Sequence, residues 1–176
     1  MPRPTCSVFV ATSLDGFIAR RDGGLDWLAA VSTPGEDYGY QGLFDAVDTI
    51  LLGRNTWEVA RRFEIWPYGG KRVVVLAHGP VSGALGEDFM EGDPVEVLER
   101  LGEEGARRVY ADGGAVVSQL VSAGCVDELT ISVVPVVLGE GIRLFQSPLR
   151  ERPLELVSAR SFPTGLVQLR YRPRRG

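Results

Sequence analysis

Short apolar stretches alternate along this chain with segments in which apolar residues recur at helical spacing. β-Branched and aromatic residues are dense in the segments that we predict to be strands, which are 6–13, 48–53, 71–77, 107–112 and 127–139. The segments that we predict to be helical are 26–31, 36–47, 55–63, 93–105 and 114–124. A terminal β-hairpin is predicted from 153–162 and 165–173, with 163–165 as its turn. The glycine-rich, acidic segment 81–92 is expected to be mostly loop.

Capping residues and helix breakers set several of these boundaries. Asp93 and Pro94 are typical of the start of a helix, and Gly105 is typical of its end. Asn55 is expected to cap the helix that follows the second predicted strand. Pro135 has no backbone N–H to donate, so we expect the strand that contains it to be bulged or interrupted there.

Alternating strands and helices, followed by a closing hairpin, are typical of an α/β domain. We predict one domain over residues 1–176 with a mostly parallel, twisted central sheet, flanking helices and a C-terminal antiparallel hairpin. Sheets of this kind bind ligands in crevices at the carboxyl ends of their strands. Residues that follow a predicted strand are therefore the first candidates for a functional site.

Composition narrows the function classes. The 176 residues are 44% hydrophobic and 24% charged with a net charge of −4, which is typical of a globular protein and does not indicate nucleic-acid binding. No apolar stretch approaches the roughly 20 residues that span a bilayer, and the first residues lack the apolar run of a signal peptide. Cys6 and Cys125 form no CxxC motif. We therefore expect a cytoplasmic protein with reduced cysteines and no membrane or nucleic-acid partner.

The sequence contains one histidine, His78, which excludes several mechanisms. A zinc deaminase would need HxE and PCxxC motifs, and a histidine-ligated metal cluster needs more than one histidine, so we expect no metal site. A Ser-His-Asp hydrolase would have to use His78, and no GxSxG motif accompanies it.

Two glycines follow the predicted strand 107–112 directly. Gly113 and Gly114 precede a predicted helix, where the absence of a Cβ would let a pyrophosphate approach unpaired backbone N–H groups. The alternative is a tight turn with a helix cap. The spacing is not the GxGxxG of Rossmann folds.

Two more strand ends carry related features. Gly53, Arg54 and Thr56 follow a buried strand, and a planar guanidinium beside a hydroxyl suits a phosphate. The alternative is an ordinary joint with a surface arginine. His78 follows the next strand, with a surface loop histidine as the alternative. Because the carboxyl ends of parallel strands share one edge, a dinucleotide lying across that edge would contact all three strand ends.

Three segments resemble the dihydrofolate reductase-like superfamily. They are VFVATSLDGFIA (8–19), DTILLGRNTWE (48–58) and RVYADGGAVVSQLVSAGCVDELTISVVPVVLGEGIRLF (108–145). The chain is most similar to the branch that contains the riboflavin-biosynthesis reductase (RibD C-terminal) domain. This resemblance implies NADPH as the cofactor and hydride transfer to a small substrate. It also implies a homodimer, because members of the branch often pair through the C-terminal hairpin.

The resemblance also implies roles for individual residues. Ala11 would flank the nicotinamide, and Gly113 and Gly114 would hold the pyrophosphate. The other implied cofactor contacts are Gly53, Arg54 and Thr56 at the phosphates, with Arg54 near a 2′-phosphate, and Leu76, Ala77 and His78 on the adenosine side.

The substrate side offers two carboxylates and two aromatic residues. In classical dihydrofolate reductases a helical carboxylate binds the pterin ring, and Asp37 has a similar spacing to the GR motif; the alternative is a helix cap. In the riboflavin branch the Asp of SLDG is associated with substrate, and here this is Asp15, with loop capping as the alternative. Phe17 and Trp27 would stack on a flat heterocycle, although core packing explains them equally well.

These observations predict an NADPH-dependent reductase of a small pterin- or pyrimidine-like heterocycle. The alternative is a non-catalytic module that binds NADPH or a nucleotide on the same scaffold.

Overall fold

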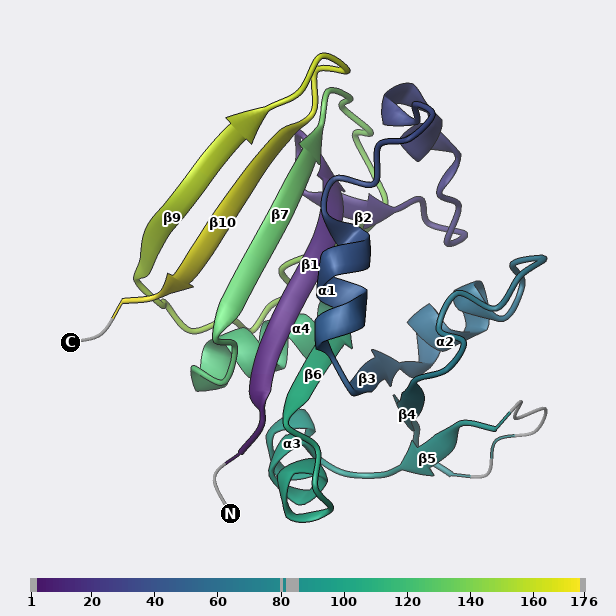
Figure 1. Ribbon diagram of the computed structural model, residues 1–176, viewed down its shortest axis with the longest axis vertical. Helices are drawn as coiled ribbons and strands as arrows, with labels where there is room; N and C mark the ends of the chain where they lie inside the picture. The colour runs from purple at the N-terminus through teal and green to yellow at the C-terminus, as the bar shows by residue number, and fades with distance from the viewer. Residues whose placement is uncertain (1–2, 80, 82–85, 175–176) are drawn as a thin grey trace.

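The computed structural model describes residues 3–79, 81 and 86–174. Its centre is an eight-stranded sheet with the order β5-β4-β3-β6-β1-β7-β10-β9 (Figure 1). The strands are β1 (Thr5–Ser13), β3 (Thr49–Gly53), β4 (Arg72–Leu76), β5 (Asp88–Met90), β6 (Arg108–Asp112), β7 (Glu128–Val134), β9 (Leu154–Ser161) and β10 (Val167–Pro173). Neighbours from β5 to β7 are parallel, and β10 is antiparallel to both β7 and β9. The predicted α/β fold with a C-terminal antiparallel hairpin is confirmed.

Helices cover both faces of the sheet, with α1 on one face and α3 and α4 behind the other (Figure 1). The helices are α1 (Tyr40–Ala46), α2 (Arg54–Ala60), α3 (Pro94–Glu103) and α4 (Gly114–Ala123), with a 3-10 helix η1 (Asp26–Val31). A separate antiparallel pair is formed by β2 (Phe17–Ala19) and β8 (Ile142–Arg143). No helix in the described part of the chain is long and apolar enough to cross a bilayer.

Side-chain alternation along the strands produces two apolar layers. Ile50 and Leu52 of β3 pack with residues of α1 and α2, whereas Leu51 packs with residues of α3 and α4. On β6, Tyr110 faces the α1 and α2 layer, and Val109 faces the other. Because both faces are covered, these strands appear in the sequence as continuous apolar runs.

Two helix starts illustrate the local signals. The Asp93 carboxylate accepts a hydrogen bond from the Val95 N–H at 2.8 Å, as the predicted cap of α3 requires. The predicted Asn55 cap of α2 is wrong, because α2 begins at Arg54 and Gly53 occupies the cap position. The extended backbone of Gly53, with φ −74° and ψ 157°, makes the turn into the helix and leaves Asn55 in the first turn.

Two strand predictions also differ from the structure. Strand β7 ends at Val134, so the interruption expected at Pro135 is present, but the strand does not resume over residues 136–139 as predicted. The predicted loop 81–92 contains the short strand β5, which pairs with β4, while residues 82–85 lie outside the described residues. Pairing with β4 stabilises a three-residue strand that its own sequence does not indicate.

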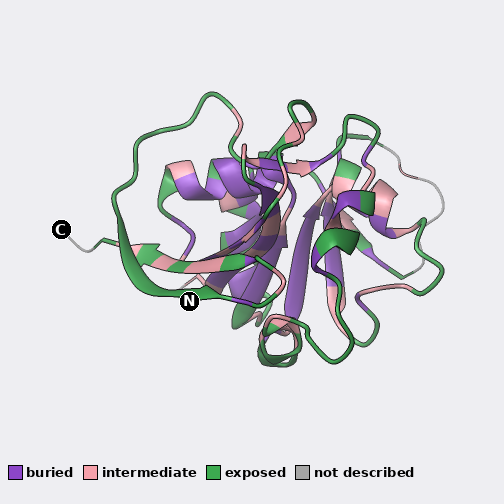
Figure 2. Ribbon diagram, turned by 90° about the horizontal axis from the view of Figure 1, so that it is seen from above, coloured by how far each residue is buried: buried purple, intermediate pink, exposed green. Residues whose placement is uncertain are grey.

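The terminal hairpin forms the exposed edge of the sheet. Every residue of β9 is exposed, whereas the central strands are buried (Figure 2). The helices α3 and α4 pack against the strands on the other side of β10, so the hairpin extends past the helical layers (Figure 1).

Candidate active site

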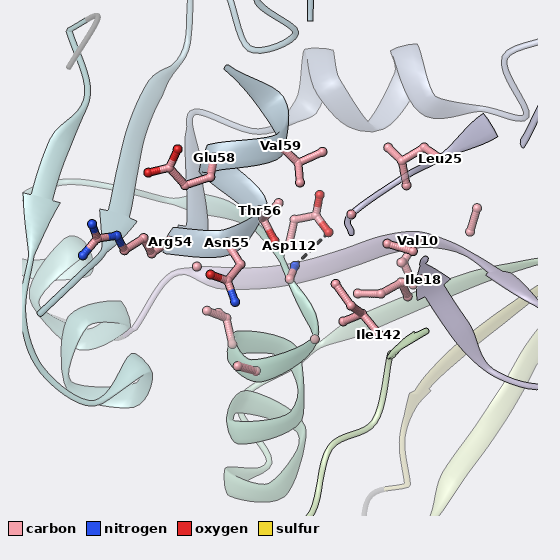
Figure 3. A pocket seen from close by; sticks show the side chains of 18 of the residues that line it. Val10, Ile18, Leu25, Arg54, Asn55, Thr56, Glu58, Val59, Asp112 and Ile142 are labelled. Carbon is pink, nitrogen blue, oxygen red and sulfur yellow. Dashed lines mark hydrogen bonds between the residues drawn. The ribbon is translucent and has the colours of Figure 1, made fainter. Parts of the chain in front are cut away.

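A cavity of about 700 Å³ opens where β1, β3 and β6 end at the carboxyl edge of the sheet. Figure 3 shows Arg54 at one end of this cavity and the apolar side chains of Val10, Ile18 and Ile142 gathered at the other. Helix α2 forms one wall, and the loop between β2 and η1 contributes to another. This volume and mixed lining are typical of cofactor sites.

The two glycines after β6 both line this cavity and both have steric reasons within the protein. Gly113 has φ +105°, and a Cβ added there would lie 2.6 Å from the Thr56 Oγ1. A Cβ on Gly114 would lie 2.5 Å from the Arg143 carbonyl oxygen and 2.5 Å from the Gln146 Nε2. The glycine pair therefore lets α2 and the segment 143–146 approach the start of α4.

The first turn of α2 supplies a cation and a hydroxyl to the same cavity. Arg54 and Thr56 line it together with Gly53 and Gly113. Within residues 3–79, 81 and 86–174 the exposed Arg54 guanidinium has no ion-pair partner. The sequence analysis predicted that these four residues lie together at the carboxyl edge of the sheet, and in the structure all four line this cavity.

The same cavity is also lined by a carboxylate, Asp112, that the sequence analysis did not select. Asp112, the last residue of β6, accepts hydrogen bonds from the Gly113 N–H at 2.8 Å and the Tyr110 hydroxyl at 3.3 Å, and also from the Tyr68 hydroxyl. Loss of hydration on burial raises the pKa of Asp112, and these three hydrogen bonds oppose part of that effect. Burial, and to a lesser degree the nearby charge of Asp112, raises the pKa of Tyr40 to about 12.

A second cavity of about 430 Å³ adjoins the first. The two share Phe9, Ala11 and Leu28 as lining residues, so Ala11 lies at their junction. Asp37 and Ser132 line the second cavity, and all of its lining residues are neutral or acidic. Apolar walls with a few carboxylate and hydroxyl groups suit a small flat molecule that carries hydrogen-bond donors.

The two predicted catalytic carboxylates have local structural partners. Asp15 accepts hydrogen bonds from the Ser13 hydroxyl at 2.7 Å, the Leu138 N–H at 3.0 Å and the Gly139 N–H at 2.7 Å. These bonds, the Ser13 bond foremost, lower the pKa of Asp15 to about 2. Asp15 lines neither cavity and ties the β1–β2 turn to the segment after β7.

Asp37 lines the second cavity, but its carboxylate also lies at the start of α1. Asp37 accepts hydrogen bonds from the Gln41 N–H at 2.8 Å and the Gly39 N–H at 2.9 Å, and these bonds lower its pKa. Asp37 therefore binds backbone N–H groups at the start of α1, whose cap position is Gly39, and it also borders the second cavity.

The predicted aromatic residues lie behind the cavity walls. Phe17 is 6% exposed and Trp27 is 5% exposed, and neither lines either of the two cavities described above. Trp27 packs with Val134, Phe162 and other apolar residues, and its Nε1 has no hydrogen-bond partner among the described residues. These placements correspond to the core-packing alternative for both side chains.

The predicted adenosine-side residues lie outside the 700 Å³ cavity. Leu76 ends β4, Ala77 is buried, and His78 is exposed beyond them. They lie at the end of β4, which neighbours β3 on the side away from β6. No group of three or more potential metal-ligating side chains occurs among the residues that the structure describes.

One signal in the sequence points to Asp112. It stands between a buried strand and the glycine pair, in the tetrapeptide ADGG, two residues after Tyr110. Strand alternation places Tyr110 and Asp112 on the same face of β6. The partner Tyr68 comes from the segment after α2 and cannot be inferred from local sequence.

The sheet, its antiparallel hairpin and the cavity across the strand ends define a protein of the dihydrofolate reductase-like fold. A dihydrofolate reductase from Enterococcus faecalis, solved in complex with NADP(H), has this fold; its TM-score is 0.71 at 19% identity, and the match covers 97% of each chain. Within this fold the chain belongs to the family of RibD C-terminal domains, whose family model matches residues 60–168.

Relatives in sequence support the same family. The uncharacterized protein YwjB of Bacillus subtilis is 35% identical over 167 residues, which cover 93% of this chain and 95% of the relative. A protein from Shewanella sp. PV-4 named for riboflavin biosynthesis has a TM-score of 0.89 and 32% identity, covering 97% of this chain and 99% of that one. The predicted superfamily and branch are therefore confirmed.

Proposed function

We propose that this protein is an NADPH-dependent reductase that transfers a hydride to a small pterin- or pyrimidine-like heterocycle. The observation that carries the proposal is that two cavities adjoin and share Phe9, Ala11 and Leu28 in their walls. One cavity has phosphate-suited groups and the other has the walls of a small-ring site. The fold shared with reductases supports the same reading.

The first cavity fits the phosphate groups of a dinucleotide. Gly113 lines the cavity beside the Thr56 hydroxyl, and Arg54, which has no ion-pair partner among the described residues, lies at the adjoining end. A guanidinium binds phosphate through two parallel hydrogen bonds, so Arg54 would hold a 2′-phosphate and favour NADPH over NADH. Ala11, at the junction of the cavities, would flank the nicotinamide.

When bound, the nicotinamide supplies the hydride, and the protein contributes orientation and exclusion of water. The loop between β2 and η1 is placed to exclude water from the cavity. Arg20 and Asp26 close this loop with an ion pair at 2.7 Å, and a Cβ on Gly23 would lie 2.8 Å from a methyl group of Val59 on α2. The loop therefore packs directly against the wall of the cavity.

Thermal unfolding with NADPH and with NADH at equal concentration tests the cofactor. At a hundred times its Kd, a ligand adds about 2.7 kcal/mol, which raises the Tm of a domain of this size by roughly 5–10 °C. We expect a shift with NADPH and a much smaller one with NADH. No shift with either would contradict the proposal.

Arg54→Ala sharpens that test. Loss of a charge-assisted hydrogen bond of about 1.5–3 kcal/mol would weaken NADPH binding roughly 10- to 100-fold and leave NADH binding unchanged. Arg107→Ala is the charge-matched control, because Arg107 is exposed at the opposite end of β6. Equal loss in both variants would remove the 2′-phosphate assignment. NADPH binding without oxidation by any heterocycle would favour the non-catalytic module instead.

We also propose that two copies associate through the C-terminal hairpin. The edge strand β9 exposes Leu154, Leu156 and Val157 at 38%, 52% and 51%. An unpaired edge with exposed apolar side chains is a surface suited to a second copy. Light scattering should give twice the chain mass of 19.1 kDa, and Leu156→Asp should give monomers. A monomeric native protein at all concentrations would contradict this.

A further inference from the structure

Asp112, at the end of the central strand β6, is one of three acidic residues that line the 700 Å³ cavity. Part of its surface faces the cavity, and Figure 3 shows it between α2 side chains Thr56 and Val59 and the apolar Val10 and Ile18. Its hydrogen-bond donors are the Gly113 N–H and two tyrosine hydroxyls. A carboxyl group in such surroundings exchanges protons with a ligand rather than with bulk water.

Three elements pack titratable groups against Asp112, and all three groups are tyrosines. Tyr110 comes from β6, Tyr68 from the segment between α2 and β4, and Tyr40 from α1. The Tyr110 hydroxyl also donates to the Phe9 carbonyl at 3.0 Å, and Phe9 lines both cavities, so the cluster lies beside the place where the cofactor cavity meets the proposed substrate cavity. Tyr40 makes an aromatic contact with Tyr110, with ring centroids 6.3 Å apart.

Among the residues that the structure describes, no cation forms an ion pair with this carboxylate. The arginines that line the same cavity are Arg21, Arg54 and Arg62. Arg21 pairs with Glu140, and no ion pair to Asp112 occurs among the described residues. Burial without a cationic partner favours the neutral, proton-carrying acid, and the two hydroxyls limit how strongly it does so.

The other two carboxylates considered for proton supply are held in the opposite state. Asp15 has a pKa of about 2, and backbone hydrogen bonds also lower the pKa of Asp37. Both therefore remain ionised near neutral pH and have no proton to give. Asp112 alone of the three carries a raised pKa and lines the cavity with the proposed cofactor contacts.

We propose that Asp112 is the acid that protonates the substrate, with Tyr68 and Tyr110 as positioning residues that hold its carboxyl group. This inference rests on the proposed reductase function. As the carbon of a C=N bond receives the hydride, the π electrons of that bond move to nitrogen, and the nitrogen takes the proton from the Asp112 carboxyl. The resulting carboxylate keeps its bonds from Gly113, Tyr68 and Tyr110, and solvent returns the proton after product leaves.

Asp112→Asn tests the proton step with a matched pair of probes. We would follow NADPH oxidation with 3,4-dihydroisoquinoline, a flat imine that must gain a proton, and with N-methyl-3,4-dihydroisoquinolinium, which needs none. We expect Asp112→Asn to slow the imine reaction roughly 100-fold or more and to change the iminium reaction little. Equal loss with both probes, or full activity with the imine, would overturn the proposal.

A measurement that needs no turnover tests the same group. The ¹³C shift of the Asp112 carboxyl, assigned by its loss in Asp112→Asn, reports its titration with and without NADP⁺. We expect a midpoint above the ordinary value of 3.8. Tyr68→Phe removes a hydrogen bond that stabilises the carboxylate, so the midpoint should rise further, by about one pH unit. A midpoint at or below 3.8, or no response to Tyr68→Phe, would overturn the assignment.

Tyr40→Phe is the control for the tyrosine substitution. Tyr40 belongs to the same aromatic cluster, yet it donates no hydrogen bond to Asp112, so its removal should leave the midpoint in place. Failure of the wild-type protein to bind or oxidise NADPH would refute the proposed function itself. Normal NADPH binding with an unchanged imine rate in Asp112→Asn would refute only the proton donor.

Discussion

Substitution of Gly113 by alanine tests why two glycines stand together after β6. The structure gives this change two separable costs. The backbone of Gly113 has φ +105° and ψ 132°, a conformation that L-residues avoid. The new Cβ would also lie 2.6 Å from the Thr56 Oγ1, far inside normal contact distance.

Each cost has an order of magnitude. Holding a non-glycine residue in such a backbone conformation costs about 1–3 kcal/mol, and crowding a packed site costs about 1–3 kcal/mol more. Gly113→Ala should therefore lower the free energy of unfolding by roughly 2–6 kcal/mol, a large part of the 5–15 kcal/mol typical of a domain. A second substitution in the same chain, Thr56→Ala, removes the Thr56 oxygen. The double variant should therefore regain the stability lost to the steric contact and still lack the stability lost to the backbone conformation.

Urea unfolding followed by circular dichroism measures these differences. The double-mutant cycle of Gly113→Ala and Thr56→Ala should give a favourable coupling of about 1–3 kcal/mol. Gly35→Ala is the control, because Gly35 has φ +79° and nothing within 4 Å of an added Cβ, so it should pay only a backbone cost of about 1–2 kcal/mol. A Gly113→Ala variant no less stable than Gly35→Ala, or a coupling near zero, would refute the contact with Thr56.

Two further predictions concern acid sensitivity and helix α1. The low pKa of Asp15, caused first by Ser13 and then by the Leu138 and Gly139 N–H groups, means that its contribution to stability is complete above the unfolded value near 3.8 and is lost as pH falls toward 2. Asp15→Asn should therefore flatten the dependence of Tm on pH between about 5 and 2, measured by differential scanning fluorimetry; an unchanged slope would contradict this. Gly42→Ala should raise the free energy of unfolding by about 0.5–1 kcal/mol in urea, because Gly42 lies within α1 with nothing within 4 Å of an added Cβ; a loss of stability would show that α1 does not tolerate the Cβ.

Much of the fold can be predicted from sequence because its signals are local. Continuous apolar runs mark strands with both faces buried, and the Asp93-Pro94 pair marks the start of α3. The elements that escaped prediction are stabilised by distant partners. Strand β5 needs β4, and β2 needs β8. The true start of α2 depends on the backbone of Gly53, which residue preferences for caps do not report.

The residues of the candidate site also divide into those that local sequence predicts and those that depend on distant segments. Strand ends on a shared edge are predictable from topology, so Gly53, Arg54, Thr56 and the glycine pair could be placed together. The burial of Trp27 and the hydrogen bonds from Leu138 and Gly139 to Asp15 depend on segments more than a hundred residues away. The tyrosine cluster around Asp112 likewise joins three elements that no local pattern connects.

Gly113 and Gly114 are required for different structural reasons. Gly114 is required by the carbonyl of Arg143 and the amide of Gln146, so its presence is explained by packing and says nothing about a ligand. Gly113 is required by the approach of Thr56, and that approach also brings the Thr56 hydroxyl and the α2 wall to the strand end where the cavity opens. Packing and binding therefore make the same demand at Gly113. Only Arg54, which has no structural partner among the described residues, is left for a ligand to explain, so the comparison of NADPH with NADH in Arg54→Ala tests the cofactor more directly than any glycine substitution.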